Sequence, residues 1–409
     1  MSTTRRIPEL TLVEHEVTVP LDHAGARNEM LTVFAREVIG AQRGAENLPY
    51  LVYLQGGPGF EAPRQTAAPA AGTWLERALR DYRVLLLDQR GTGRSSPIGT
   101  LPGLSPEEQA AYLTHFRADS IVRDAERLRE QLGVEQWSVL GQSFGGFCVI
   151  AYLSAVPESL REALICGGLP PLGLPIDEVY ARTYPTVRAR CVAYYERYPD
   201  DRDHVREILR RCVLGEIVLP TGEQLTPRRF RQLGLLLGMS DGAERLHHIL
   251  ELPIESQAFL HDVDRASDFS RNPLFAAVHE SCYADGTTTR WAAERLLPDD
   301  LADGEDFTGE HIFSWMFEDY AALRPLREAA DLIAKHEWPR LYDEERLAAN
   351  KVPTAAAIYA NDMYVPRELS EETARRIGSL RPWLTNEYEH DGLRADGARV
   401  LDRLLSLVR

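Results

Sequence analysis

The chain has no hydrophobic run long enough to cross a membrane. A membrane-spanning helix needs about 18 consecutive apolar residues, and no stretch of the 409 residues approaches that length. The first residues, MSTTRRIPELTLVEHEV, include two arginines but no apolar segment after them, so they lack the pattern of a secretory signal. We therefore expect a cytoplasmic protein without a membrane partner.

Cysteine is scarce, and its spacing fits neither a disulfide framework nor a metal site. The five cysteines lie far apart and include no CxxC pair, which is typical of reduced, buried thiols. Nothing in the sequence has the spacing of metal ligands. The G-x-x-x-x-G-K-S/T pattern of a nucleotide-binding loop is also absent. The sequence therefore predicts neither a metal nor a cofactor.

Positive charge is in deficit. Lys and Arg number 46 against 62 Asp and Glu, which gives a formal net charge of -16. Such a chain repels a phosphate backbone, so we expect no nucleic-acid partner. The excess of acid favours solubility, and it would also suit a cationic substrate.

Strand and helix patterns alternate at both ends of the chain. Residues 50–56 and 82–90 are short and apolar like buried strands. Residues 119–133 have apolar side chains at helical spacing and end in glycine. From residue 169 to about 350 the pattern is mainly helical, and the alternation resumes over 351–409. This order predicts a doubly wound, mostly parallel sheet with an inserted helical cap.

A serine between glycines lies where one predicted strand gives way to a helix. Gly141, Ser143 and Gly145 form the G-x-S-x-G pattern of a nucleophile elbow. Such a turn strains the serine backbone and brings other backbone very close, so its flanking positions favour glycine. The start of the following helix directs free N–H groups at developing negative charge. The alternative is a glycine-rich packing turn with an inert serine.

A nucleophilic serine needs a histidine base and an acid that orients it. In this arrangement the chain order is serine, acid, histidine. His390 alone among the histidines follows the resumed alternation, directly after a predicted strand, and Asp362 ends the strand before that. Glu387 and Glu389 alternate within the last strand, and Asp391 adjoins the base too closely to orient it. We therefore predict Asp362 as the acid.

Two backbone N–H groups are expected to form an oxyanion hole. One belongs to Phe144, the residue after the nucleophile, and the other to the loop that follows the third strand of the fold. That loop is Gln55 to Gly59, QGGPG, in which Gly57 retains its N–H donor and Pro58 stiffens the turn. Read alone, the stretch would also suit an ordinary Gly-Pro turn.

Four motifs together resemble the proline iminopeptidases, serine aminopeptidases of the α/β-hydrolase superfamily. They are LQGGPG (54–59), LLLDQRGTGRSSP (85–97), ADSIVRDAERLR (118–129) and GQSFGGF (141–147). The resemblance implies an α/β-hydrolase fold with an eight-stranded sheet. It divides the chain into a core of 1–168 and 351–409 and a helical cap of 169–350.

The same resemblance implies release of an N-terminal residue, preferentially proline, from short peptides with a free amine. The family's nucleophile, acid and base correspond to Ser143, Asp362 and His390, and an acyl-enzyme forms on the serine.

In this family carboxylates of the cap bind the substrate's ammonium group, which needs a partly desolvated site. The matching residues are Glu280 and Glu310, with Phe313 and Trp315 as walls for the proline ring. Acidic residues on cap helices also commonly just face water.

Two other functions stay open from the sequence. An esterase or another small-molecule hydrolase would use the same triad, but it would cleave acyl esters that lack an amine. A ligand-binding receptor of the same fold would need no intact triad. Asp88, Arg90 and Arg94 are interpreted as structural residues that brace the floor of the site.

Overall fold

A computed structural model describes residues 3–43 and 46–409. One sheet has the strand order β1-β2-β3-β5-β4-β6-β7-β8-β9. The pairs β1–β2, β2–β3 and β3–β5 are antiparallel, and all other neighbours are parallel. The strands are β1 (Thr3–Ile7), β2 (Leu10–Pro20), β3 (Met30–Gly40), β4 (Tyr50–Leu54), β5 (Arg83–Asp88), β6 (Trp137–Gln142), β7 (Leu160–Cys166), β8 (Thr354–Tyr359) and β9 (Leu380–Thr385).

Over residues 3–43 and 46–409 the sheet has nine strands, so the predicted number of eight is wrong by one. The additional strand is β1, which pairs antiparallel with β2 at the edge of the sheet. Its sequence TTRRI is exposed at every position except the partly buried Ile7. An edge strand without a buried face has no alternation of apolar and polar residues, and that alternation is the signal from which strands are predicted.

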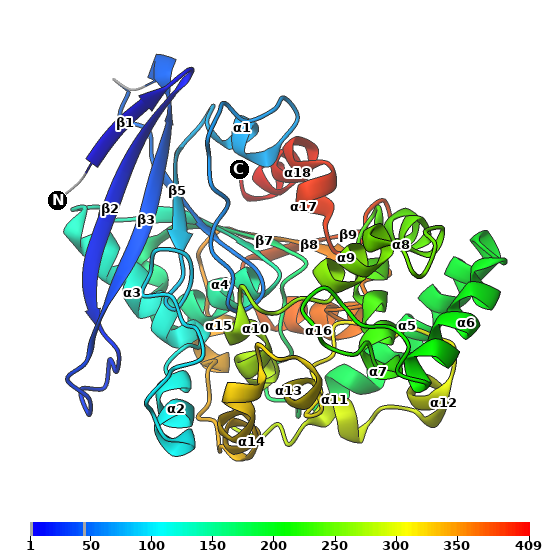
Figure 1. Ribbon diagram of the computed structural model, residues 1–409. Helices are drawn as coiled ribbons and strands as arrows, with labels where there is room; N and C mark the ends of the chain where they lie inside the picture. The colour runs from blue at the N-terminus through cyan, green and yellow to red at the C-terminus, as the bar shows by residue number, and fades with distance from the viewer. Residues whose placement is uncertain (1–2, 44–45) are drawn as a thin grey trace.

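Helices cover both faces of the sheet, as predicted (Figure 1). In β4, Leu51 and Tyr53 pack into one hydrophobic cluster with α1 and α18, whereas Val52 and Leu54 pack into another with α3 and α4. A fully buried strand needs apolar side chains on both faces. The core helices are α1 (Trp74–Ala78), α2 (Pro106–Leu113), α3 (Ala118–Gln131), α4 (Phe144–Ala155), α16 (Arg367–Arg376), α17 (Gly392–Ala395) and α18 (Gly397–Val408), with the 3₁₀ helices η1 (Ala41–Arg43) and η2 (Pro157–Ser159).

A long helical segment separates β7 from β8, and Figure 1 shows it in green to yellow on one side of the molecule. We propose residues 169–350 as the limits of this cap. Its elements are α5 (Asp177–Arg197), α6 (Asp201–Val213), α7 (Pro227–Arg231), η3 (Gln232–Gly238), α8 (Gly242–Leu250), α9 (Gln257–Ala266), α10 (Pro273–Val278), η4 (Glu280–Tyr283), α11 (Ala292–Arg295), α12 (Asp299–Asp303), α13 (Met316–Asp319), η5 (Arg324–Leu326), α14 (Arg327–Lys335) and α15 (Glu344–Ala348).

The helical segment contacts the core at loops that follow parallel strands. Gly59, after β4, packs against the backbone of Phe275. The N–H of His390, after β9, donates to the carbonyl oxygen of Gly238 at 3.2 Å. Ligands of open α/β sheets bind at the carboxyl ends of the strands. These contacts therefore border the expected position of the site.

Arg90 has the structural role predicted for it. Its guanidinium is buried and forms two hydrogen bonds of 2.6 Å to the carboxylate of Asp124, and it also donates to the carbonyl oxygens of Leu21 and His115. A buried charge needs this full set of partners. Within the residues that the structure describes, no helix is long and apolar enough to cross a membrane.

Candidate active site

Ser143 lies in a strained turn between β6 and α4. Its backbone dihedrals are φ 55° and ψ -126°. A positive φ is unusual for a residue with a side chain, and it persists only where the surrounding structure enforces it. The predicted change from strand to helix at this serine is confirmed.

Glycines allow the backbone to pack tightly around that turn. A Cβ atom at Gly141 would lie 2.2 Å from the carbonyl oxygen of Gly145, and one at Gly145 would lie 1.9 Å from that of Leu54. A Cβ atom at Gly146 would lie 2.4 Å from the carbonyl oxygen of Gly168. Any side chain at these positions would push α4 away from the sheet and move the serine.

The predicted base and acid are joined by a hydrogen bond. The distance from His390 Nδ1 to Asp362 Oδ2 is 2.7 Å, and both side chains are buried. Asp362 Oδ1 accepts the N–H groups of Tyr364 at 2.9 Å and Val365 at 3.0 Å, which fix the carboxylate. Burial by itself lowers the pKa of His390, but the charge and hydrogen bond of Asp362 raise it above its ordinary value.

Two adjacent glycines after β7 lie close to His390 and to Ser143, respectively. A Cβ atom at Gly167 would lie 3.3 Å from His390 Nδ1, and one at Gly168 would lie 2.1 Å from the carbonyl oxygen of Ser143. The hydrogen bonds of the described residues do not include one between Ser143 and His390. Catalytic hydrogen bonds often tighten only when substrate binds.

The two N–H groups predicted for an oxyanion hole lie on segments that flank the serine. Phe144 is the first residue of α4, and Gly57 lies in the loop after β4. A Cβ atom at Gly56 would lie 2.9 Å from the Cβ of Ser143, so this loop packs against the nucleophile. The backbone hydrogen bonds between elements of the described chain include none donated by Gly57 or Phe144. Both N–H groups are therefore available to a reacting oxygen.

The Glu310 carboxylate interacts electrostatically with the predicted base and acid. Burial raises its pKa to about 7, the charge of His390 lowers it, and that of Asp362 raises it. Glu310 therefore interacts electrostatically with both His390 and Asp362. In the part of the chain that the structure describes, the Glu310 carboxylate has no hydrogen bond or ion pair. A partly accessible acid in this state can bind a cation.

Glu280 supplies a second buried carboxylate in the same region. Its Oε1 accepts the N–H of Ala293 at 2.9 Å, whereas its Oε2 is buried without a hydrogen-bond partner. Burial raises the pKa of Glu280 to about 7. Burial also raises the pKa of the Cys282 thiol, and the charges of Glu310 and Glu280 raise it further. Both carboxylates therefore act electrostatically on the same buried thiol.

Phe313 and Trp315 form a stacked pair with ring centroids 5.5 Å apart. They line a cavity of about 220 Å³ together with Arg228, whose guanidinium lies 4.7 Å from the centre of the Trp315 ring. None of these contacts joins the pair to the triad. Their role as walls for a proline ring stays a prediction.

Comparison with known proteins identifies the family. The model of the alpha/beta hydrolase fold matches residues 49–393. A proline iminopeptidase of Aeromonas sobria is 48% identical over 410 residues, which cover 97% of this chain and 96% of the relative. A proline iminopeptidase of Aspergillus aculeatus is 35% identical, with 96% and 93% covered.

The chain belongs to the proline iminopeptidase family. Among solved structures, esterase E22 has a TM-score of 0.52 at 12% identity, with 97% of this chain and 100% of the esterase covered. At that identity the likeness is one of fold alone.

The sequence did not reveal how the cap of this member of the proline iminopeptidase family holds His390. The last residue of η3, Gly238, accepts the His390 N–H at its carbonyl oxygen. The loop from η3 to α8 carries Ser240, whose N–H and hydroxyl donate to Asp391 Oδ1 at 2.9 and 2.6 Å. Asp391 was rejected as the triad acid, and the structure gives it this bridging position instead. Ser240 and Asp391 are 151 positions apart, so no local pattern could pair them.

Tyr364 is a second residue that the sequence did not single out. Its ring meets the His390 ring edge to face with centroids 4.8 Å apart, and its hydroxyl donates to the carbonyl oxygen of Leu235 in η3. The histidine is thus held between the Asp362 loop and the cap.

We predict that Ser240→Ala lowers kcat about 3- to 10-fold with little change in KM. A hydrogen bond to a charged group contributes about 1.5 to 3 kcal/mol, and this one holds the loop that carries His390. Steady-state kinetics of the variant check this. Ser240→Thr, which retains a hydroxyl, should restore most of the rate. Ser406→Ala on α18 is the control, since its exposed hydroxyl bonds only to the Arg403 carbonyl. Unchanged kcat in Ser240→Ala would contradict the prediction.

Proposed function

We propose that the protein is a cytoplasmic serine aminopeptidase that releases an N-terminal residue, preferentially proline, from short peptides. The single observation that carries this proposal is the Glu310 carboxylate, which interacts electrostatically with His390 and Asp362 and has no hydrogen bond or ion pair among the described residues. An esterase has no need of a carboxylate there, whereas an aminopeptidase must bind the ammonium group of its substrate. The proline iminopeptidases among its relatives support the same assignment.

Catalysis starts with attack of Ser143 Oγ on the carbonyl carbon of the N-terminal residue. As this bond forms, His390 accepts the serine proton at Nε2, because Asp362 holds the Nδ1 side. The N–H groups of Gly57 and Phe144 stabilise the negative charge on the carbonyl oxygen. The C–N bond then breaks, and His390 passes the proton to the departing nitrogen.

The product of this first half is an ester between the N-terminal residue and Ser143. Water attacks the ester carbon while His390 accepts its proton. The ester bond breaks, the proton returns to Ser143 Oγ, and the free amino acid leaves. Every proton transfer uses one histidine nitrogen, so the chemistry needs no cofactor.

The ammonium group fixes the register of cleavage. In the proposed complex Glu310 and Glu280 stabilise the positive amine, and the first carbonyl of the peptide then faces Ser143. Binding of the cation also lowers the free energy of the ionised carboxylates, which are otherwise destabilised by burial. A substrate with a blocked N-terminus would leave both acids without a partner.

Glu310→Gln should impair amine-bearing substrates selectively. We expect kcat/KM for prolyl-naphthylamide to fall about 10-fold or more, because a buried charge pair contributes about 2 to 5 kcal/mol. Hydrolysis of p-nitrophenyl acetate, which has no amine, is measured on the same preparations. Glu318→Gln is a matched control, since that cap glutamate is exposed and paired with Arg327. Equal losses on both substrates would contradict the amine-binding role.

The pH dependence should report both ionisations. Glu310, with a pKa of about 7, must be charged to bind the ammonium group, and His390, with a raised pKa, must be neutral to act as a base. Both conditions are lost as the pH falls, so kcat/KM for prolyl-naphthylamide should rise with pH through about 7. In Glu310→Gln the pH profile of kcat/KM should retain only the ionisation of His390. An identical profile in both proteins would exclude Glu310 from the titration.

A further inference from the structure

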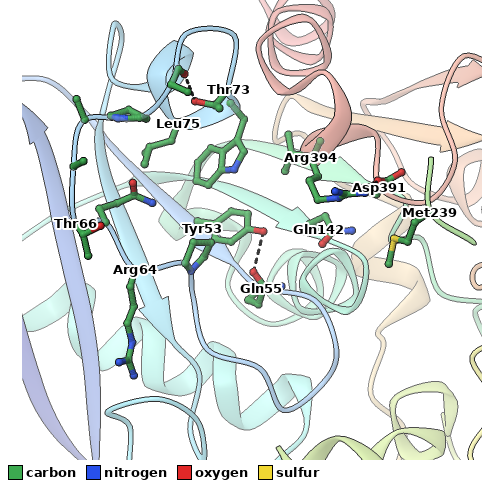
Figure 2. A pocket seen from close by; sticks show the side chains of 18 residues that line it. Tyr53, Gln55, Arg64, Thr66, Thr73, Leu75, Gln142, Met239, Asp391 and Arg394 are labelled. Atoms are coloured by element: carbon green, nitrogen blue, oxygen red, sulfur yellow. Dashed lines mark hydrogen bonds and ion pairs between the residues drawn. The ribbon is translucent and has the colours of Figure 1, made fainter. Parts of the chain in front are cut away.

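A cavity of about 570 Å³ lies behind the catalytic turn (Figure 2). Tyr53 and Gln55 reach it from the end of β4, Gln142 from the end of β6, and Trp74 from the start of α1. Its volume falls within the range of about 300 to 1,000 Å³ that is usual for binding pockets of small molecules. Nothing in the mechanism above uses this space.

The cavity borders all three catalytic segments. Gln142 directly precedes Ser143, Asp391 directly follows His390, and Gln55 begins the loop that holds Gly57. A Cβ atom at Gly56 would lie 2.9 Å from the Cβ of Ser143 and 3.2 Å from Gln142 Oε1. One glycine therefore separates the nucleophile from the wall of the cavity.

The lining is aromatic and neutral where it faces the open space. The rings of Tyr53 and Trp74 stack with centroids 4.5 Å apart at 24°. Both residues line the cavity, and Figure 2 shows the Arg64 side chain directed away from Tyr53. Arg394 pairs with Asp241 and Asp391, so its charge is compensated.

Amide groups supply the polar part of the lining. The Tyr53 hydroxyl donates to Gln55 Oε1 at 3.1 Å, which leaves the amide N–H₂ of Gln55 free to donate. Among the described residues, the side-chain amide of Gln142 has no hydrogen-bond partner. Each such amide offers both donors and an acceptor, as a peptide bond requires.

We propose that this cavity is the subsite for the residue that follows the N-terminal residue of the substrate, and that it favours an aromatic or large apolar side chain there. The inference rests on the proposed function.

If Glu310 binds the amine on one side of the triad, the departing nitrogen must lie at His390, which donates a proton to that nitrogen. The remaining peptide then needs space next to the histidine, and the cavity at Asp391 and Gln142 provides it. A side chain stacked on Trp74 would contribute to acylation alone, because deacylation begins after the leaving peptide has gone.

The test compares two substrates with the same acyl group, prolinamide and prolyl-phenylalaninamide. The first releases ammonia and has nothing to place in the cavity, while the second places a phenyl ring there. In Trp74→Leu we expect kcat/KM for prolyl-phenylalaninamide, divided by kcat/KM for prolinamide, to fall about 10-fold. A 10-fold change corresponds to about 1.4 kcal/mol of transition-state stabilisation. Phenylalaninamide alone should inhibit prolinamide hydrolysis by the wild-type protein and do so more weakly in the variant.

Trp383→Leu is the matched control. Trp383 is also partly buried and packs on the same hydrophobic cluster as Trp74, but it does not line the cavity. Its ratio of kcat/KM values for the two substrates should equal that of the wild type, and thermal unfolding establishes that both variants are folded.

A wild-type ratio of kcat/KM values in Trp74→Leu would overturn the subsite. Failure of the wild-type protein to hydrolyse either substrate would instead refute the proposed function, and the subsite with it. Inhibition by phenylalaninamide that is equally strong in both proteins would also contradict the subsite.

Discussion

The close approach of backbone to backbone around Ser143 is the constraint on which the site depends. The turn holds the serine at φ 55°, and a Cβ atom at Gly145 would lie 1.9 Å from a carbonyl oxygen of β4. Strain of this kind is retained only when the surrounding packing fixes it. Because β4, α4 and the loop after β7 meet here, the nucleophile, the Gly57 loop and the histidine are positioned by one set of contacts.

The cap holds the catalytic base as well as covering it. His390 is hydrogen-bonded to Asp362 in the core and, through its backbone, to Gly238 in the cap. Glu310, another cap residue, acts electrostatically on the same histidine. In the proposed mechanism, binding of the amine and orientation of the base therefore depend on the same segment, and displacement of the cap would disturb both.

Local patterns in the sequence predicted the fold and the elbow, but contacts between distant residues could not be predicted. The G-x-S-x-G glycines predicted the strained turn at Ser143 because turn chemistry is encoded within a few positions. The chain order predicted the pair Asp362 and His390, which the structure joins by a hydrogen bond. Resemblance, not periodicity, singled out Glu310. Strand β1 was missed because an exposed edge strand has no apolar face. The Ser240–Asp391 bridge was missed because its partners belong to the cap and the core.

The acyl-enzyme on Ser143 is the central claim, and mass spectrometry of a rapidly quenched reaction tests it most directly. Prolyl-naphthylamide is mixed with the enzyme and stopped in acid, which preserves the ester, and the protein is then digested and mapped. The peptide that contains Ser143 should carry one prolyl group, and the same peptide from Ser143→Ala should carry none. A prolyl group on another residue, or turnover of the substrate by Ser143→Ala at the wild-type rate, would contradict the account.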